Sequence, residues 1–328
     1  MTVWPLLLLA AAAPPADKVV FDTDCGFFGD DGAALAMVLR SPVKVQVTAI
    51  TAVSGNVWAA ESAGYLTEIL GLLGHPEIKP YVGAQMPIVH TADMAKLEGP
   101  LEFQGAFGNP VKIAPPSEPA ALTALAAAVE QSPSQITILA LGPMTNVALL
   151  LRLHPDLEGK IKRIVFMGGN VHVPGNASAA AEFNFWFDPE AAQAVLRSRI
   201  PEKVMFPLDI CNRAVLTKAR FDEIVAARTP VTARYKEDYG LRYPGFVKNP
   251  NATGFLWDEL AAAWLLDTGF VTQSDTEWLD IDTRFGKTYG ATVPLERRLA
   301  PGATPVRVML DLDYPRLWTL YKRLLTAP

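Results

Sequence analysis

Histidine and cysteine are scarce in this chain, which has four histidines and two cysteines among its 328 residues. Two cysteines exclude a disulfide-dense scaffold and a multi-cysteine zinc or iron–sulfur site. Basic residues are not in excess either, because 29 Lys and Arg against 34 Asp and Glu leave a net charge of −5, which disfavours nucleic acid as a partner. Charged residues make up 19% and hydrophobic ones 50%, so the composition is that of a folded protein with a large core. The chemistry of such a chain rests mainly on carboxylates, amides and aromatic rings.

Within residues 1–16, a short apolar run at 3–13 is followed by two prolines. The run has the length of the hydrophobic part of a signal peptide and is too short to span a membrane. Small residues at 10–13 suit a cleavage site, whereas the first residues include no Lys or Arg. Two readings stay open: the signal peptide of an exported (periplasmic or secreted) protein, or the disordered tail of a cytoplasmic one. No other segment is long and apolar enough to predict a membrane span.

Short apolar runs alternate with helical patterns along residues 17–328, which we treat as a single domain. This alternation predicts an α/β fold with a mostly parallel central sheet and helices on both faces. Ligands of such sheets bind outside the carboxyl ends of the strands. A segment rich in Pro and Gly at 83–119 predicts a long excursion. Strands are expected at 18–22, 43–51, 78–82, 136–141, 161–167, 203–208 and 306–312, and helices at 31–40, 58–73, 120–130, 146–153, 188–197 and 258–266.

The most informative segment is residues 22–31, DTDCGFFGDD, at the carboxyl end of the first predicted strand. It holds four carboxylates, those of Asp22, Asp24, Asp30 and Asp31. Acids packed this closely repel one another and are costly to desolvate, and a hard divalent cation such as Ca²⁺ or Mg²⁺ relieves both effects. The alternative is a solvated turn in which Asp30 or Asp31 caps the next helix. Capping does not account for the two acids on the strand end, so the segment predicts a metal site.

An Asp-x-Asp pair after the first strand is typical of two families. In haloacid-dehalogenase-like phosphotransferases the first Asp is a nucleophile and a Thr or Val closes the motif, whereas here Cys25-Gly26 follows. The pattern Asp-x-Asp-x-Gly-x-x-x-Asp-Asp-Gly resembles instead the signature of the nucleoside hydrolases, the inosine–uridine-preferring superfamily of N-ribosyl hydrolases. Further family-like segments follow in the expected order: Ser54-Gly55-Asn56, Leu141-Gly142-Pro143, Met167-Gly168-Gly169, Gly175-Asn176, Glu182-Phe183-Asn184 and Trp257-Asp258.

The resemblance implies a Rossmann-like nucleoside hydrolase fold, with a mostly parallel, mixed central sheet, and a bound Ca²⁺. The implied metal ligands are Asp24, Asp31, the main-chain carbonyl of Leu141, and Asp258. Asp24 would also be the general base that takes a proton from the attacking water. The implied ligands of the ribose hydroxyls are Asp30, Asn56, Asn176, Glu182 and Asn184. Two of these residues have a structural alternative, Glu182 as a plain loop acid and Asn56 as a helix cap.

The chain departs from the inosine–uridine-preferring pattern on the side of the base. Those members place a His immediately before the late metal-ligand Asp, as the leaving-group acid, and here that position is Trp257. Trp-Asp is similar to the purine-specific inosine–adenosine–guanosine branch, in which a Trp stacks on the base. A stacked purine is more easily protonated, so solvent can supply the proton. The alternative for Trp257 is a core aromatic. Candidates for a second stacking ring are Phe103, Phe107, Tyr239 and Tyr243.

These patterns predict a Ca²⁺-dependent N-ribosyl hydrolase that splits purine ribonucleosides into ribose and free base. Two alternatives stay open, a metal-dependent phosphotransferase that uses the Asp22/Asp24 pair and a non-catalytic nucleoside- or ribose-binding protein. The expected partner is a small-molecule nucleoside, and the family analogy implies a homodimer or homotetramer. Cys25 and Cys211 are expected as buried thiols without a catalytic role.

Overall fold

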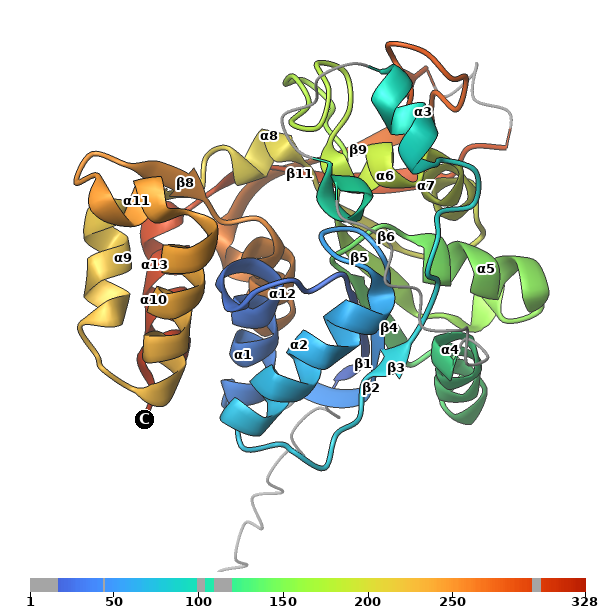
Figure 1. Cartoon of the computed structure of the whole chain (residues 1–328). Helices are drawn as coiled ribbons and strands as arrows, with labels where there is room; N and C mark the ends of the chain where they lie inside the picture. Colours follow the sequence, from blue (N-terminus) through green and yellow to red (C-terminus); the bar gives the residue numbers. More distant parts are fainter. Residues whose placement is uncertain (1–16, 44, 99–103, 109–119, 297–301) are drawn as a thin grey trace, which may run out of the picture.

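The computed structural model describes residues 17–43, 45–98, 104–108, 120–296 and 302–328 (Figure 1). In this part of the chain a nine-stranded sheet has the order β10-β9-β11-β6-β5-β4-β1-β2-β3. From β3 to β11 the strands pair in parallel, and β9 and β10 pair antiparallel at one edge. The predicted α/β class with a mostly parallel, mixed sheet is therefore confirmed. The predicted signal peptide or tail, residues 1–16, lies outside the described residues.

The central strands are short apolar runs, as expected for strands that are covered on both faces. Their bounds are β1 (Asp17–Thr23), β2 (Val45–Ala52), β4 (Ile136–Ala140), β5 (Arg163–Met167), β6 (Lys203–Phe206) and β11 (Pro305–Leu312). The short strand β3 (Tyr81–Val82) forms one edge of the sheet. The strand β9 (Val271–Ile281), between β11 and β10, and the edge strand β10 (Thr292–Leu295) were not predicted. The first seven residues of β9 include several exposed polar side chains, and β10 is only four residues long, so neither shows the apolar run that marks a buried strand.

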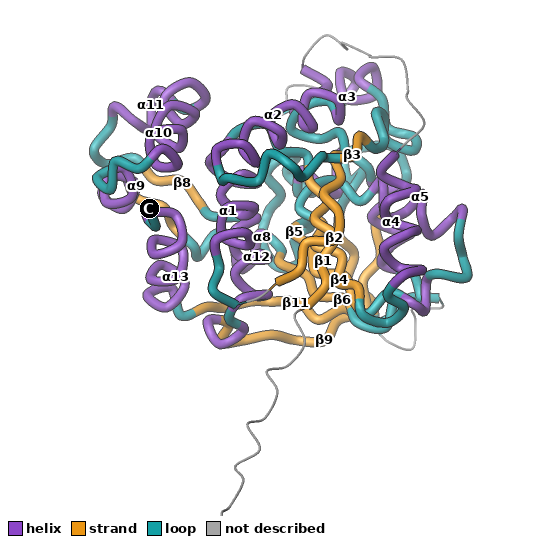
Figure 2. The backbone as a smooth tube through the Cα atoms, turned by 90° about the horizontal axis from the view of Figure 1, so that it is seen from below, coloured by secondary structure: helices purple, strands orange, loops and turns teal. Residues whose placement is uncertain are grey.

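Helices cover both faces of the sheet, as Figure 2 shows. On one face lie α1 (Ala33–Arg40), α2 (Ala59–Leu72) and α12 (Asp258–Leu266), and on the other α4 (Ala120–Gln131), α5 (Thr145–Leu153) and α7 (Pro189–Leu196). Successive side chains of β1 point to opposite faces of the sheet. Phe21 packs with the first group of helices and Val20 with the second. Within the described residues, no helix is both long and apolar enough to cross a membrane.

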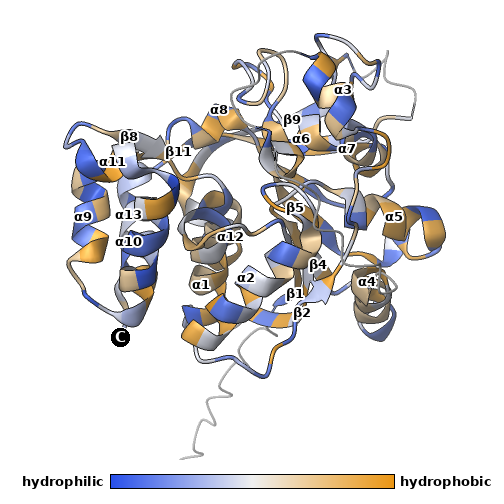
Figure 3. Cartoon of the chain, viewed as in Figure 1, coloured by the Kyte–Doolittle hydropathy of each residue, from blue (hydrophilic) through white to orange (hydrophobic). Residues whose placement is uncertain are grey.

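A second group of elements lies beyond α1, at one end of the molecule (Figure 1). It comprises α9 (Lys218–Val225), α10 (Pro230–Arg242), α11 (Pro244–Lys248), α13 (Tyr314–Thr326) and the antiparallel strand pair β7 (Val215–Thr217) and β8 (Thr253–Phe255). Figure 3 shows mostly hydrophilic residues along the visible face of α10, whereas its other face buries Tyr235 and Tyr239. The short helices are α3 (Ala92–Leu97), α6 (Phe183–Phe187) and α8 (Leu208–Cys211).

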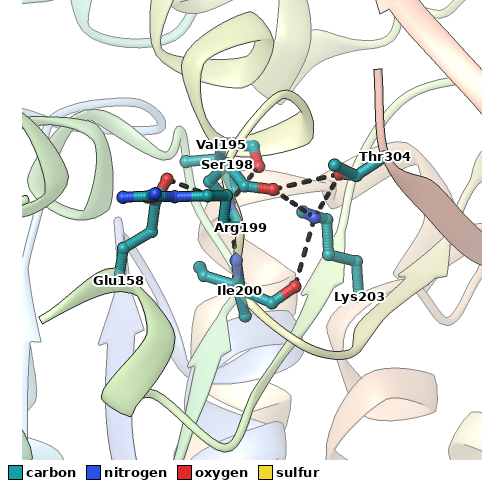
Figure 4. Close-up of polar contacts among 7 residues, drawn as sticks. All are labelled: Glu158, Val195, Ser198, Arg199, Ile200, Lys203 and Thr304. Carbon is teal, nitrogen blue, oxygen red and sulfur yellow. Dashed lines mark hydrogen bonds and ion pairs between the residues drawn. The ribbon is translucent and has the colours of Figure 1, made fainter. Parts of the chain in front are cut away.

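A buried lysine links several segments at the end of the sheet where the parallel strands begin. Lys203, the first residue of β6, is only 2% exposed, and its Nζ donates to the carbonyl of Ser198 at 2.7 Å and that of Ile200 at 3.3 Å (Figure 4). It also contacts the Thr304 hydroxyl at 2.5 Å, just before β11. Burial lowers the pKa of Lys203 to about 8. This cluster joins the chain after α7 to the start of β11, at the end of the sheet opposite the carboxyl ends of the strands.

Candidate active site

The acidic segment after β1 divides into one structural acid and three acids that face a cavity or lie beneath it. Asp22 is fully buried, and its Oδ1 accepts hydrogen bonds from Thr51 Oγ1 at 2.5 Å and Asn146 Nδ2 at 2.7 Å. Burial raises the pKa of Asp22 to about 6. Asp22 therefore ties β1 to β2 and α5. The phosphotransferase reading needs an accessible nucleophile at this position, which a buried and hydrogen-bonded Asp22 does not provide.

The next three acids converge with a fourth from α12. One carboxylate oxygen from each of Asp30, Asp31 and Asp258 lies within 4.8 Å of the others, and Asp24 contacts Asp31. Asp24, Asp31 and Asp258 are at most 3% exposed. Burial, and after it the charge of Asp31, raises the pKa of Asp24 well above its usual range; burial and then Asp30 do the same for Asp258. In the absence of a cation such acids take up protons, whereas a divalent cation stabilises their ionised forms.

Two glycines allow the backbone to approach Asp24 closely. A Cβ at Gly142 would lie 2.8 Å from Asp24 Oδ1, and a Cβ at Gly55 would overlap Asp24 Oδ2. The backbone N–H of Asn56 donates to that same Oδ2 at 2.5 Å. Leu141, whose carbonyl is an implied metal ligand, directly precedes Gly142 and lines the same cavity as Asp258. Carboxylate oxygens and one main-chain carbonyl are the donors that Ca²⁺ prefers, so the residues present fit the implied ion.

The predicted ribose ligands surround these acids. Asn56 Nδ2 lies 3.4 Å from Asp31 Oδ2. Asn184 Nδ2 donates to the carbonyls of Leu141 at 2.9 Å and Met167 at 3.1 Å. Asn176 Oδ1 accepts from the backbone of Phe183 at 2.9 Å. The loops at the ends of β2, β4 and β5 thus hold the amides in fixed positions.

Glu182 is a helix cap that also lines the cavity. Its carboxylate caps α6, accepting from the backbone N–H of Asn184 at 2.9 Å and Phe185 at 3.1 Å, and it also accepts from Gly169 at 2.7 Å. Burial raises the pKa of Glu182 to about 7. Its position at the cavity agrees with the predicted contact to ribose, which stays a prediction. Asp188, in contrast, caps α7 through Ala191 at 3.1 Å.

A cavity of about 330 Å³ gathers most of the predicted site residues. Asp24 and Asp31 lie beneath this cavity. Both accept hydrogen bonds from Asn56, a residue of the cavity wall. Two further aromatic residues line the wall: Phe27, and Tyr243, which is one of the predicted candidates for a second stacking ring. Glu259 was not predicted as a residue of this region; it is 1% exposed and accepts from the backbone N–H of Trp257 at 2.9 Å. The lining residues are Phe27, Asp30, Asn56, Leu141, Met167, Asn176, Glu182, Phe183, Asn184, Tyr243, Trp257 and Asp258.

The four histidines all lie away from the lining of this cavity. His90 is fully buried, and its Nδ1 lies 2.9 Å from the carbonyl of Trp186. Of the other candidate stacking rings, Phe107 stacks on Phe187 at 4.4 Å, Tyr239 is buried on α10, and Phe103 lies outside the described residues. The two cysteines, Cys25 and Cys211, are buried free thiols, as predicted.

Comparisons with known proteins show the family of this chain. The family model described as inosine-uridine preferring nucleoside hydrolase matches residues 19–319. The chain belongs to the inosine–uridine preferring nucleoside hydrolase family. It is 34% identical over 309 residues to a pyrimidine-specific ribonucleoside hydrolase, RihA, from Salmonella agona, which covers 90% of this chain and 94% of that protein. The RihA of Klebsiella pneumoniae is 34% identical over 299 residues, covering 88% and 93% of the two chains.

Solved structures of nucleoside hydrolases share the fold. An inosine-guanosine nucleoside hydrolase superposes with a TM-score of 0.78 at 26% identity, covering 95% of this chain and 99% of that chain. A purine-preferring ribonucleoside hydrolase from Gardnerella vaginalis gives a TM-score of 0.73 at 26% identity, covering 94% and 98%. The fold and the hydrolysis of ribonucleosides are therefore shared with the family, whereas the names of these relatives differ in the preferred base.

Proposed function

We propose that this protein is a Ca²⁺-dependent N-ribosyl hydrolase that converts purine ribonucleosides to ribose and free base by direct attack of water. The observation that carries the proposal is the cavity itself. Carboxylates converge at its floor, fixed amides surround the space above them, and aromatic rings stand at its wall. These groups match, in turn, a cation, a sugar and a base.

The acids at the floor have complementary roles. Asp24, Asp31, Asp258 and the carbonyl of Leu141 would hold Ca²⁺, which supplies positive charge that keeps the acids ionised and lowers the pKa of a nearby water. Asp24 would be the general base. It differs from Asp22 in lying next to Asp31 within the acid cluster, and the backbone N–H of Asn56 holds its Oδ2 at 2.5 Å. Asp30 stands at the cavity wall beside this cluster, where its carboxylate can accept from a ribose hydroxyl.

The side-chain amides would orient the ribose by hydrogen bonds. Asn56, Asn176 and Asn184 are each tied to the protein by a hydrogen bond, so their remaining donors and acceptors are already oriented. The N-glycosidic bond breaks through a transition state with oxocarbenium character, as in glycoside hydrolysis. Ionised carboxylates close to the ring stabilise the positive charge that develops on it.

Aromatic residues support the purine preference. Trp257, at the start of α12, lines the cavity together with Phe27 and Tyr243. A ring stacked on a purine favours its protonated form, and protonation makes the base a better leaving group. Because the histidines lie away from the cavity lining, solvent is the proton source in this proposal. The relatives named pyrimidine-specific make the base preference the part that most needs an experiment.

The experiment compares kcat/KM for inosine, guanosine, adenosine, uridine and cytidine with the purified full chain. Release of ribose is followed by a reducing-sugar assay and release of base by chromatography. We expect the purine nucleosides to have the higher kcat/KM. A higher value for uridine or cytidine would overturn the purine preference. Binding of nucleosides without release of ribose would instead support the non-catalytic alternative.

A further inference from the structure

The loop after β1, residues 24–32, contacts helix α10, which lies about 200 positions later in the sequence. The backbone N–H of Phe28 donates to Asp238 Oδ2 at 2.7 Å. Asp238 is 7% exposed, and its other oxygen accepts from Arg234 Nε at 2.7 Å. Arg234 also pairs with the exposed Glu68 at 3.1 Å. Asp238 therefore bonds the loop with one oxygen while an arginine balances its charge on the other.

Aromatic contacts follow the same face of α10. The ring of Tyr235 meets Phe28 edge-on at 6.3 Å between centroids, and a Cβ at Gly29 would overlap the ring of Tyr239. The guanidinium of Arg242 lies 4.8 Å from the centre of the Phe27 ring. Residues 235, 238, 239 and 242 are three or four positions apart, so they lie on one face of the helix. That face packs against residues 27–29 of the loop.

The loop needs this support because of its unusual backbone. Residues Phe28–Gly32 form a single π-helical turn that contains both Asp30 and Asp31. Such turns are rare and are found mostly at functional sites. The N–H of Phe28 opens the turn, where a helix has no internal acceptor for it. The carboxylate of Asp238 supplies that acceptor in a buried place, where an unpaired N–H would be costly.

We propose that Asp238 is a positioning residue for hydrolysis. By accepting the hydrogen bond from the backbone N–H of Phe28, Asp238 fixes the position of the π-helical turn. The position of this turn determines where the side chains of Asp30 and Asp31 point. Asp238 itself is absent from the lining of the cavity. The inference rests on the ribonucleoside hydrolase activity of the proposed function and needs neither the purine preference nor the identity of the metal.

The test compares Asp238→Ala, Asp238→Asn and the control Glu68→Gln. Glu68→Gln weakens the ion pair between Glu68 and Arg234 but leaves the hydrogen bond between Phe28 and Asp238 intact. Each variant is assayed for kcat and KM on the nucleoside that the wild type hydrolyses fastest, with active sites counted by titration with a ribose-like inhibitor. Hydrogen exchange is measured on peptides that cover residues 25–32. Asp238→Ser replaces Asp238→Ala should the latter fail to fold.

We expect Asp238→Ala to lower kcat per active site by about 10- to 100-fold, because small displacements of catalytic groups have effects of this size. Exchange should rise in peptides over residues 25–32 and stay unchanged in the central strands. Asp238→Asn keeps one acceptor oxygen for Phe28 but turns its NH2 group toward Arg234, so it should retain clearly more of the rate than Asp238→Ala. Glu68→Gln should stay within about twofold of the wild type.

Two results would overturn the inference. One is a normal kcat and unchanged exchange in Asp238→Ala. The other is faster exchange throughout the protein with an equal loss in Asp238→Asn, which would assign Asp238 to general stability. Failure of the proposed function gives a different pattern: a wild type that prefers pyrimidines leaves the Asp238 comparison intact with that substrate. A wild type without hydrolase activity would overturn both proposals together.

Discussion

The buried Lys203 gives a sharp prediction about stability and pH. Its pKa is lowered from 10.5 to about 8 by burial, while the unfolded chain keeps the usual value. Below pH 8 both forms carry the proton. Between about pH 8 and 10.5 the folded form loses the proton first, so the unfolded form binds more protons and the stability of the fold rises with pH.

The size of the effect follows from the two pKa values. A change from 10.5 to about 8 corresponds to at most about 3 kcal/mol, since each pKa unit is worth 1.36 kcal/mol. The contacts of Nζ with Ser198, Ile200 and Thr304 persist as hydrogen bonds when the amine is neutral, although fewer protons remain to share (Figure 4). We therefore expect a gain of about 2 kcal/mol across this pH range.

The assay compares the wild type with Lys203→Met, which has a similar length and no titrating group. Urea unfolding is followed by tryptophan fluorescence from pH 7 to 10.5, and the free energy of unfolding comes from linear extrapolation. Other titrating groups contribute equally to both proteins and cancel in the difference. The stability of the wild type relative to Lys203→Met should rise over this range. A flat difference, or one that falls with pH, would refute the reasoning.

Three further predictions concern the site. Asp24→Asn should lower kcat by about 10²- to 10⁴-fold with an unchanged circular dichroism spectrum, since it removes the general base; near-normal turnover would contradict the mechanism. Trp257→Ala should lower purine turnover by about tenfold while the affinity for a ribose-like inhibitor stays within about twofold, since stacking acts on the base; equal losses would leave stacking activation unsupported. Asp22→Asn should keep kcat close to that of the wild type, since Asp22 bonds Thr51 and Asn146 and does not belong to the acid cluster; a loss as large as that of Asp24→Asn would show that Asp22 takes part in the reaction.

The strand-end residues were predictable from the sequence for a geometric reason. Parallel strands bring their carboxyl ends to one edge of a sheet, so Asp24 after β1, Asn56 after β2 and Leu141 after β4 had to lie near one another. The motifs there are short and local, and a reader of the sequence needs only the alternation of strands and helices to place them.

Contacts that depend on packing between distant segments could not be predicted in this way. Asp238 looks like an ordinary acid on a helix, and only the folded chain shows that it accepts from Phe28. Glu259 stands next to the predicted Trp-Asp pair, yet its burial beneath Tyr321, at 3.3 Å between the two side chains, depends on how α13 packs. The π-helical turn at Phe28–Gly32 was not predicted either. The helical pattern of residues 31–40 does not reveal that a turn of different geometry precedes α1.

The most direct test of the central claim is the release of ribose from inosine with and without a divalent cation. The full chain is freed of metal with a chelator, assayed, and assayed again after Ca²⁺ or Mg²⁺ is added, in buffer without phosphate and in parallel with a phosphate ester. We expect ribose and hypoxanthine to appear in equal amounts, the chelator to abolish the reaction, Ca²⁺ to restore it, and the ester to remain uncleaved. Full activity in the chelated protein, or cleavage of the ester alone with Mg²⁺, would contradict this claim.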